Sequence, residues 1–214
     1  MRFLTVIVAS VALGFGTSAE AAKYSFGTSG SVVTFHNVAS LHSFDGDVEE
    51  YGGHFDSSTG TGSFVVKTKS MTTNLGPRDK RMHAYCLESD KFPTIQFKVS
   101  GVDGLETMNS EAKRGKVTLK GDLTIRDVTK TISVPTAFVK MGNDMSLQGQ
   151  FDFKWTDYEV PDPSIFISTL YPDMSMKFSL RLKGEALPES PPVAEPAAEP
   201  ASTEATPEAA TTEQ

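Results

Sequence analysis

The chain has 214 residues, 38% of them hydrophobic and 22% charged, and a formal net charge of −7. The seven Glu of residues 185–214 equal that whole charge, so residues 23–184 are electrically balanced. A balanced body without a basic stripe excludes nucleic acid as the expected partner, because phosphate neutralisation supplies that affinity. The single Cys excludes an intramolecular disulfide, and a body of about 160 residues can fold on its core alone.

Residues 1–22 have the layout of a secretory signal peptide. Arg2 precedes an apolar run over residues 3–15, and small residues from Ala19 to Ala22 offer cleavage sites. We therefore expect a periplasmic or secreted protein. The apolar run is too short for a comfortable membrane span, so no integral span is expected.

Apolar and polar residues alternate repeatedly along the body, which predicts a mainly β fold. Phe64 and Val66, for example, alternate with Lys67 and Lys69, so that one face of the strand is dry and the other wet. Lysines repeated in this way oppose an outer-membrane barrel, whose outer band is apolar. The alternation predicts strands over residues 31–38, 61–72, 95–99, 117–125, 132–134, 151–155 and 174–182.

A short helix is predicted near residues 79–88, between the second and third of these strands. Asp79 can cap its N-terminus, and Met82, Tyr85 and Cys86 fall at helical spacing on one apolar face. Cys86 is therefore expected to be a small buried hydrophobe on the inner face of the helix.

Residues 185–214 differ in composition from the rest of the chain. They are rich in Pro, Ala, Glu, Ser and Thr and contain no aromatic residue, Lys or Arg. Such a segment cannot bury enough apolar surface to fold, so we expect a disordered acidic tail.

Strands with one dry face suit either a sandwich or an up-and-down barrel, and the alternation by itself leaves that choice open. A twisted sheet must cover its dry face with a second sheet or curl onto itself. Closure into a barrel would also remove the exposed edges.

Two stretches resemble the YceI-like family of periplasmic lipid-binding proteins. Residues 78–97 hold an Arg-Asp pair, a short helix, an aromatic-proline step and a strand, and residues 121–135 look like the family's strand, turn, strand element. The resemblance runs over residues 23–184. It implies an eight-stranded antiparallel lipocalin-like barrel that holds a polyisoprenoid or a similar long apolar chain. Two departures from the family pattern are Asp127, where Gly is usual, and Cys86-Leu87, where many members have a Phe pair.

The resemblance makes the inward apolar residues candidate contacts for an isoprenoid or quinone-like lipid. A barrel of this size is either filled by side chains or leaves room for one ligand, and the frequent Phe together with Met174 and Met176 favour a cavity. Arg78 or His83 at the rim could orient a polar head group. The candidate ligand-binding residues are Phe35, Phe44, Phe64, Met82, Leu87, Phe92, Ile95, Phe97, Leu123, Ile125, Phe151, Phe153, Trp155, Met176 and Phe178.

No motif in the sequence indicates catalysis or a metal site. There is no Gly-x-Ser-x-Gly, and among the four His the only local pairing with another ligand type is His83 with Cys86. We expect neither enzyme activity nor a metal, and no cofactor other than a bound lipid. Arg78 and Asp79 have a structural interpretation, in which Asp79 caps the helix and Arg78 holds the loop of residues 72–74.

A second hypothesis remains open at this point. A filled-core β domain could serve as a protein-interaction or stress-response module in the periplasm, and a solid interior would favour it. The sequence also leaves open whether the protein forms a homodimer.

Overall fold

The computed structural model describes residues 23–164 and 167–185. The predicted signal peptide lies outside the described residues, as does the predicted tail beyond Glu185. The helical segments are η1 (Thr68–Ser70), α1 (Gly76–Arg81), the π-helical η2 (Met82–Cys86), α2 (Leu105–Asn109) and η3 (Trp155–Tyr158). The strands are β1 (Lys23–Phe26), β2 (Val32–Ala39), β3 (Ser43–Val48), β4 (Tyr51–Asp56), β5 (Thr61–Lys67), β6 (Met71–Thr72), β7 (Thr94–Asp103), β8 (Arg114–Ile125), β9 (Val128–Met141), β10 (Asp144–Lys154) and β11 (Leu170–Gly184).

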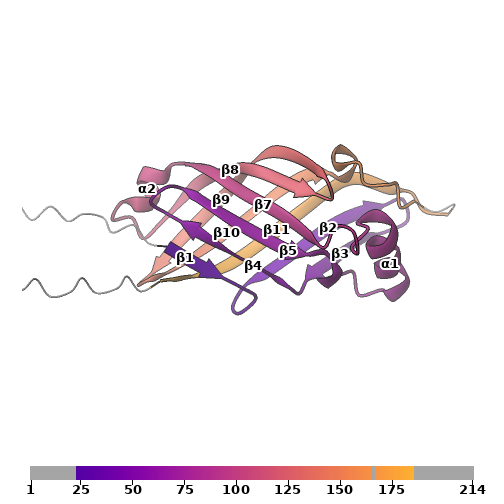
Figure 1. Cartoon of the computed structure of the whole chain (residues 1–214), viewed down its shortest axis with the longest axis horizontal. Helices are drawn as coiled ribbons and strands as arrows, with labels where there is room; N and C mark the ends of the chain where they lie inside the picture. The colour runs from indigo at the N-terminus through magenta and orange to yellow at the C-terminus, as the bar shows by residue number, and fades with distance from the viewer. Residues whose placement is uncertain (1–22, 165–166, 186–214) are drawn as a thin grey trace, which may run out of the picture.

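All the strands belong to one antiparallel sheet that closes on itself (Figure 1). Closure depends on the short strand β1, which pairs with β4 on one side and with the end of β11 on the other. Strand β2 continues the wall along β11, and the pair β3 and β6 extends it beyond β4 and β5. The predicted eight-stranded antiparallel barrel is confirmed. Three of its eight strands are interrupted, so that β1 and β2, β3 and β4, and β5 and β6 are each two segments of one barrel strand.

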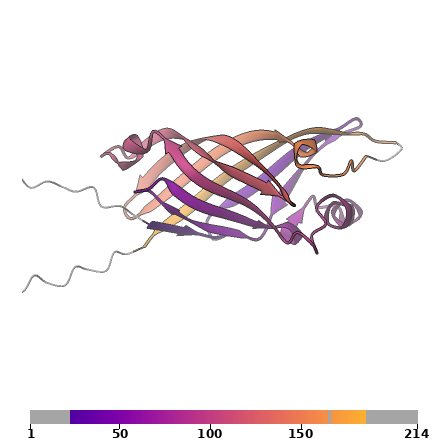
Figure 2. The same ribbon diagram turned by 45° about the horizontal axis from the view of Figure 1, so that its top comes forward.

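One end of the barrel is closed and packed. Helix α2 lies there, with Met108 only 1% exposed, and the Asn109 side-chain amide donates to the Ser57 carbonyl oxygen at 2.8 Å. The described chain begins and ends at this same end, where the Glu185 amide donates to the Lys23 carbonyl oxygen at 2.8 Å. Figures 1 and 2 both place α1 at the opposite end, so the helix stands over the far opening of the barrel.

The helix begins earlier than the sequence predicts. It starts at Gly76, and Pro77 sits in its first turn, where the fixed φ of proline and its missing N–H favour helix initiation. Asp79 therefore lies inside the helix and does not cap it, so that prediction is wrong. Its carboxylate reaches back to the preceding loop and accepts from the Thr72 hydroxyl and the Thr73 amide, both at 2.7 Å.

The predicted apolar face of the helix is only partly right. Cys86 is buried as expected, but Tyr85 is 46% exposed. The wider π-helical turn of η2 changes the angle between successive side chains, so the spacing expected of an α-helix does not hold. The Tyr85 ring instead lies 4.8 Å from the Arg81 guanidinium.

The strand predicted over residues 61–72 is also interrupted. A turn of 3₁₀ helix, η1, separates β5 from β6. The Ser70 hydroxyl holds this turn by donating to the Lys67 carbonyl oxygen at 2.8 Å and accepting from the Glu50 amide at 2.9 Å. Local side-chain bonding of this kind competes with the backbone hydrogen bonds of the sheet, which explains why the strand breaks although the alternation of apolar and polar residues continues.

The turn between β8 and β9 consists of Arg126 and Asp127. Arg126 takes the left-handed conformation, with φ at 57°. Its guanidinium donates to the Glu159 carbonyl oxygen at 2.6 Å and forms an ion pair with Glu88. These contacts tie the turn to two neighbouring loops, which offsets the cost of the left-handed backbone.

Candidate functional site

A cavity of about 500 Å³ occupies the barrel at the end covered by α1. Its wall is built in layers by strand register: Phe35 faces Met176, which faces Phe151, and one layer nearer the opening Asn37 faces Met174, which faces Phe153. Alternation along each strand directs these side chains inward. Ligand sites in proteins commonly have volumes between about 300 and 1,000 Å³, so the cavity is large enough for a small lipid.

A second, smaller space of about 100 Å³ lies deeper in the barrel. Val66, Ile95, Leu123, Phe151 and Met176 line both spaces, so these side chains separate the two. Beyond the smaller space the interior is filled by the core at the α2 end. The fully buried members of that core include Phe55, Met108, Phe138, Met145, Leu147 and Leu182.

The structure brings fourteen of the fifteen predicted contact residues to these two spaces. Phe92 lines neither of them; the Lys91 ammonium lies 4.7 Å from its ring and the Arg126 guanidinium 5.4 Å. Phe64, Phe97 and Phe178 line only the smaller space. The larger cavity is lined by Phe35, Phe44, Met82, Leu87, Ile95, Leu123, Ile125, Phe151, Phe153, Trp155 and Met176.

Several lining residues were not among the predicted contacts. Asn37 and Ala39 come from β2, and their positions two and four residues after Phe35 would have indicated the inward face. Met174 shares the inward face of β11 with Met176. The cavity is also lined by Met71, Leu75, Pro77, Arg81, Cys86, Val160, Pro163 and Leu170, which lie in loops, in short segments or at strand ends where the alternation carries no signal.

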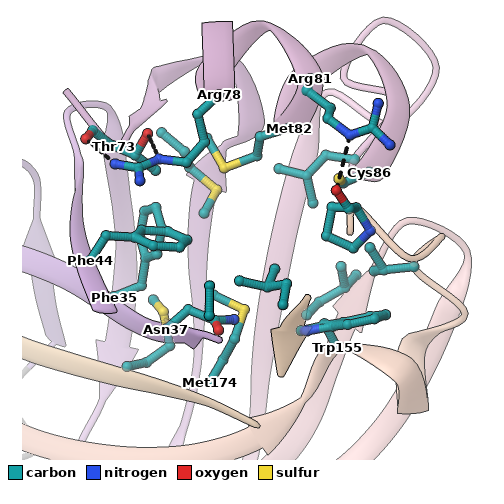
Figure 3. A pocket seen from close by; sticks show the side chains of 18 of the residues that line it. Phe35, Asn37, Phe44, Thr73, Arg78, Arg81, Met82, Cys86, Trp155 and Met174 are labelled. Carbon is teal, nitrogen blue, oxygen red and sulfur yellow. Dashed lines mark hydrogen bonds between the residues drawn. The ribbon is translucent and has the colours of Figure 1, made fainter. Parts of the chain in front are cut away.

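Arg78 lies at the cavity opening and fixes the loop before the helix, as predicted. Its Nε donates to the Thr73 hydroxyl at 2.7 Å and its Nη2 to the Thr73 carbonyl oxygen at 2.8 Å. The guanidinium carbon lies 3.9 Å from the centre of the Phe44 ring, and Nη1 lies 3.5 Å from Nε2 of His42. Figure 3 shows this cluster facing the interior.

Arg81 ties the other side of the helix to the loop after β10. Its Nε donates to the Pro163 carbonyl oxygen at 3.1 Å (Figure 3). The helix is therefore held at both edges of the opening, by Arg78 to its own preceding loop and by Arg81 to a segment distant in sequence. Two arginines in the lining give this end of a mostly apolar cavity a positive rim.

Two titratable groups beside the cavity have shifted pKa values. Burial opposes ionisation of Asp79, but hydrogen bonds from Thr73 and Thr72 outweigh it and hold the pKa of this carboxyl below its ordinary value. Burial raises the pKa of the Cys86 thiol to about 11. Cys86 is therefore a neutral thiol in the cavity wall at physiological pH, with little nucleophilic character.

The described residues hold no cluster of three or more His, Cys, Asp or Glu side chains that could bind a metal ion. His83, which was considered for the rim, is not in the cavity lining; its Nε2 lies 2.7 Å from the Met71 carbonyl oxygen, so it braces β6 against the helix. Within the described segments, no helix has the length and apolar character needed to cross a bilayer.

The fold and the cavity together define a closed antiparallel barrel with an apolar internal chamber beneath a short helix. Residues 24–185 match the YceI-like domain, and the chain belongs to that family. The UPF0312 protein of Vibrio campbellii is 29% identical over 195 residues, covering 81% of this chain and 94% of that protein.

Solved structures share the fold at lower identity. A polyisoprenoid binding domain from Saccharophagus degradans, implicated in plant cell wall breakdown, is 15% identical with a TM-score of 0.66, covering 78% of this chain and 100% of that domain. Burkholderia cenocepacia BcnA is also 15% identical, with a TM-score of 0.62 and coverage of 73% of this chain and 98% of that protein.

Proposed function

We propose that the protein binds a polyisoprenoid or a similar long apolar lipid in its barrel cavity and sequesters or carries it without changing it chemically. The observation that supports this most directly is the cavity of about 500 Å³ with a mostly apolar lining. The structural likeness to a domain described as polyisoprenoid-binding points to the same class of ligand.

Burial of the chain would supply the affinity. Each buried CH₂ contributes roughly 0.8 kcal/mol, so a chain of about 15 carbons gains roughly 12 kcal/mol. That gain is comparable with the roughly 4–15 kcal/mol lost in association, so longer chains bind tightly without a charged anchor. A quinone-like head would lie at the rim formed by Arg78 and Arg81.

The proposal includes an exported location. Residues 1–22 have the pattern of a signal peptide, and a protein between two membranes, or outside the cell, can keep an apolar chain out of water. The alternative of a filled-core interaction module requires a solid interior, and the two spaces in the barrel count against it.

Native mass spectrometry of the mature protein purified from its own envelope fraction, followed by organic extraction, tests the proposal without an assumed ligand. A stoichiometric prenyl or other long-chain adduct is the expected result. A protein that is empty and also refuses added isoprenoids would refute it.

A charge placed in the cavity wall tests where such a ligand binds. Phe153→Asp puts a carboxylate in the lining, whereas Lys154→Asp adds the same group on the exposed face of the same strand. Only Phe153→Asp is expected to lose the adduct. A folded Phe153→Asp protein that retains the wild-type amount of lipid would show that the ligand binds elsewhere.

A further inference from the structure

Asn37 interrupts the apolar inner face of β2. Val33, Phe35, Asn37 and Ala39 alternate toward the interior of the barrel, and Asn37 is 2% exposed. It pairs with Phe44 on one side and Met174 on the other, and it lines the large cavity (Figure 3). A polar residue at an inward position violates the pattern that builds the rest of this wall, and such violations are typical of functional sites.

The side-chain oxygen of Asn37 has no hydrogen-bond partner among the described residues. Two other polar side chains of the lining do have partners. The Thr73 hydroxyl accepts from Arg78 at 2.7 Å, and the Trp155 indole donates to the Tyr171 carbonyl oxygen at 2.9 Å. An unsatisfied buried amide oxygen destabilises a protein, so a ligand that donates to Oδ1 would offset this cost.

We propose that Asn37 is a polar subsite that selects a lipid bearing a hydroxyl group, which donates a hydrogen bond to Oδ1 within the cavity. The inference rests on the proposed function and adds to it the chemical class of the ligand. A hydroxyl suits the site because it can both donate and accept, so it can bind to either end of the amide. The subsite lies beside Phe44, the cross-strand neighbour of Asn37, and the Arg78 guanidinium carbon lies 3.9 Å from the centre of the Phe44 ring. The bound hydroxyl therefore lies deeper in the barrel than the arginine rim, and the chain extends toward the smaller space.

Farnesol and its methyl ether provide the test, because they share a chain and the ether lacks the donor. Trp155 is the single Trp of the chain and lines the cavity, so its fluorescence reports binding of either compound. Wild-type protein is expected to bind farnesol about tenfold more tightly than the ether, the difference of one buried hydrogen bond. Equal affinities, or failure of both compounds to bind, would overturn the subsite while leaving the proposed function standing, because a chain of about 15 carbons gains about as much as association costs and longer isoprenoids test that function separately.

Two variants locate the selectivity. Asn37→Leu is expected to abolish the preference by weakening farnesol binding while the ether binds as well as before or better. Met174→Leu alters the neighbouring wall without removing a polar group and should keep the preference. Retained selectivity in Asn37→Leu would overturn the assignment, and if that variant does not fold, the comparison of the two ligands on wild-type protein decides.

Discussion

Replacing Gly46 by Ala tests how closely the cavity wall is packed where β2 meets β3. Gly46 faces Phe35 across the two strands, and a Cβ there would lie 2.1 Å from Cζ of that ring and 2.5–2.6 Å from its two Cε atoms. Carbon atoms in contact prefer about 3.5–4.0 Å, so the ring must move by more than about 1 Å. The free direction is into the cavity, since Phe35 lines it and is otherwise 2% exposed.

We expect Gly46→Ala to lower the free energy of unfolding by about 1–3 kcal/mol, the usual cost of overpacking. In a protein of this size that corresponds to a fall in Tm of about 2–12 °C. Urea unfolding and a titration with a long-chain isoprenoid measure the two consequences, because a displaced Phe35 also narrows the binding space. The matched control is Gly101→Ala in β7, where a Cβ meets nothing within 4 Å.

The control also measures the small stabilisation that any Gly→Ala change brings through the unfolded chain, about 0.4–1 kcal/mol. A Gly46→Ala protein as stable as Gly101→Ala, with unchanged lipid affinity, would refute the reasoning. If the clash is the cause, Phe35→Leu removes the colliding ring atoms, so the double variant should be more stable than the sum of the two single effects predicts.

Three further predictions concern the region around the opening. Asp79→Asn should lower the free energy of unfolding by about 1–3 kcal/mol at pH 7, because it weakens hydrogen bonds to a charged carboxylate. Since folding lowers the pKa of Asp79, the wild-type advantage should be lost as the pH falls below about 3.9 toward the folded pKa. Unfolding measured across an acid pH series tests this, and a difference that does not depend on pH would contradict it. Burial raises the pKa of Cys86 to about 11, so at pH 8 its thiol should react with iodoacetamide at least about 100-fold more slowly than a free thiol. Mass spectrometry measures the labelling rate, and rapid labelling would contradict the prediction by showing that the helix opens readily. Arg126→Ala should cost about 1–3 kcal/mol through the lost side-chain contacts, and Arg126→Gly about 1 kcal/mol less because φ is 57°; equal unfolding energies would show that the backbone there is not strained.

The inward faces of the long strands could be predicted because alternation is a local property. On β11, Met176, Phe178, Leu180 and Leu182 follow one another at every second residue, and all four face the interior. Barrel closure could not be predicted in the same way. It depends on β1, a strand of four residues whose pairing with both β4 and β11 is a long-range contact. Only the family resemblance anticipated it.

The position of the cavity could not be predicted from the alternation of apolar and polar residues either. Alternation indicates which side chains point inward but not how much room they leave, and Phe64 and Phe153 lie at different depths although their patterns are alike. Phe92 was misplaced because the Pro that follows it fixes an extended backbone without fixing which face its ring takes. Asn37 was not predicted because a lipid site implies apolar contacts, and Asn37 is the polar exception on the inner face of β2.

The two halves of the barrel should differ in what a side chain contributes to stability. Leu147 and Phe151 lie four residues apart on the inner face of β10, but Leu147 is 0% exposed in the packed end while Phe151 borders both spaces. Leu147→Ala leaves a new cavity in a close-packed core and should cost about 3–5 kcal/mol. Phe151→Ala removes a larger side chain that already lacks neighbours on one side, so we expect about 2 kcal/mol.

That order reverses the one expected from side-chain size, and urea unfolding of the lipid-free protein measures it. A greater cost for Phe151→Ala would mean that its ring is fully packed and that the barrel is solid at this layer. The expected order would mean that side chains packed at the α2 end contribute more to the stability of the fold than those that border the two spaces. Movement of side chains to admit a lipid would then disturb the less stabilising part of the barrel and leave the packed α2 end intact.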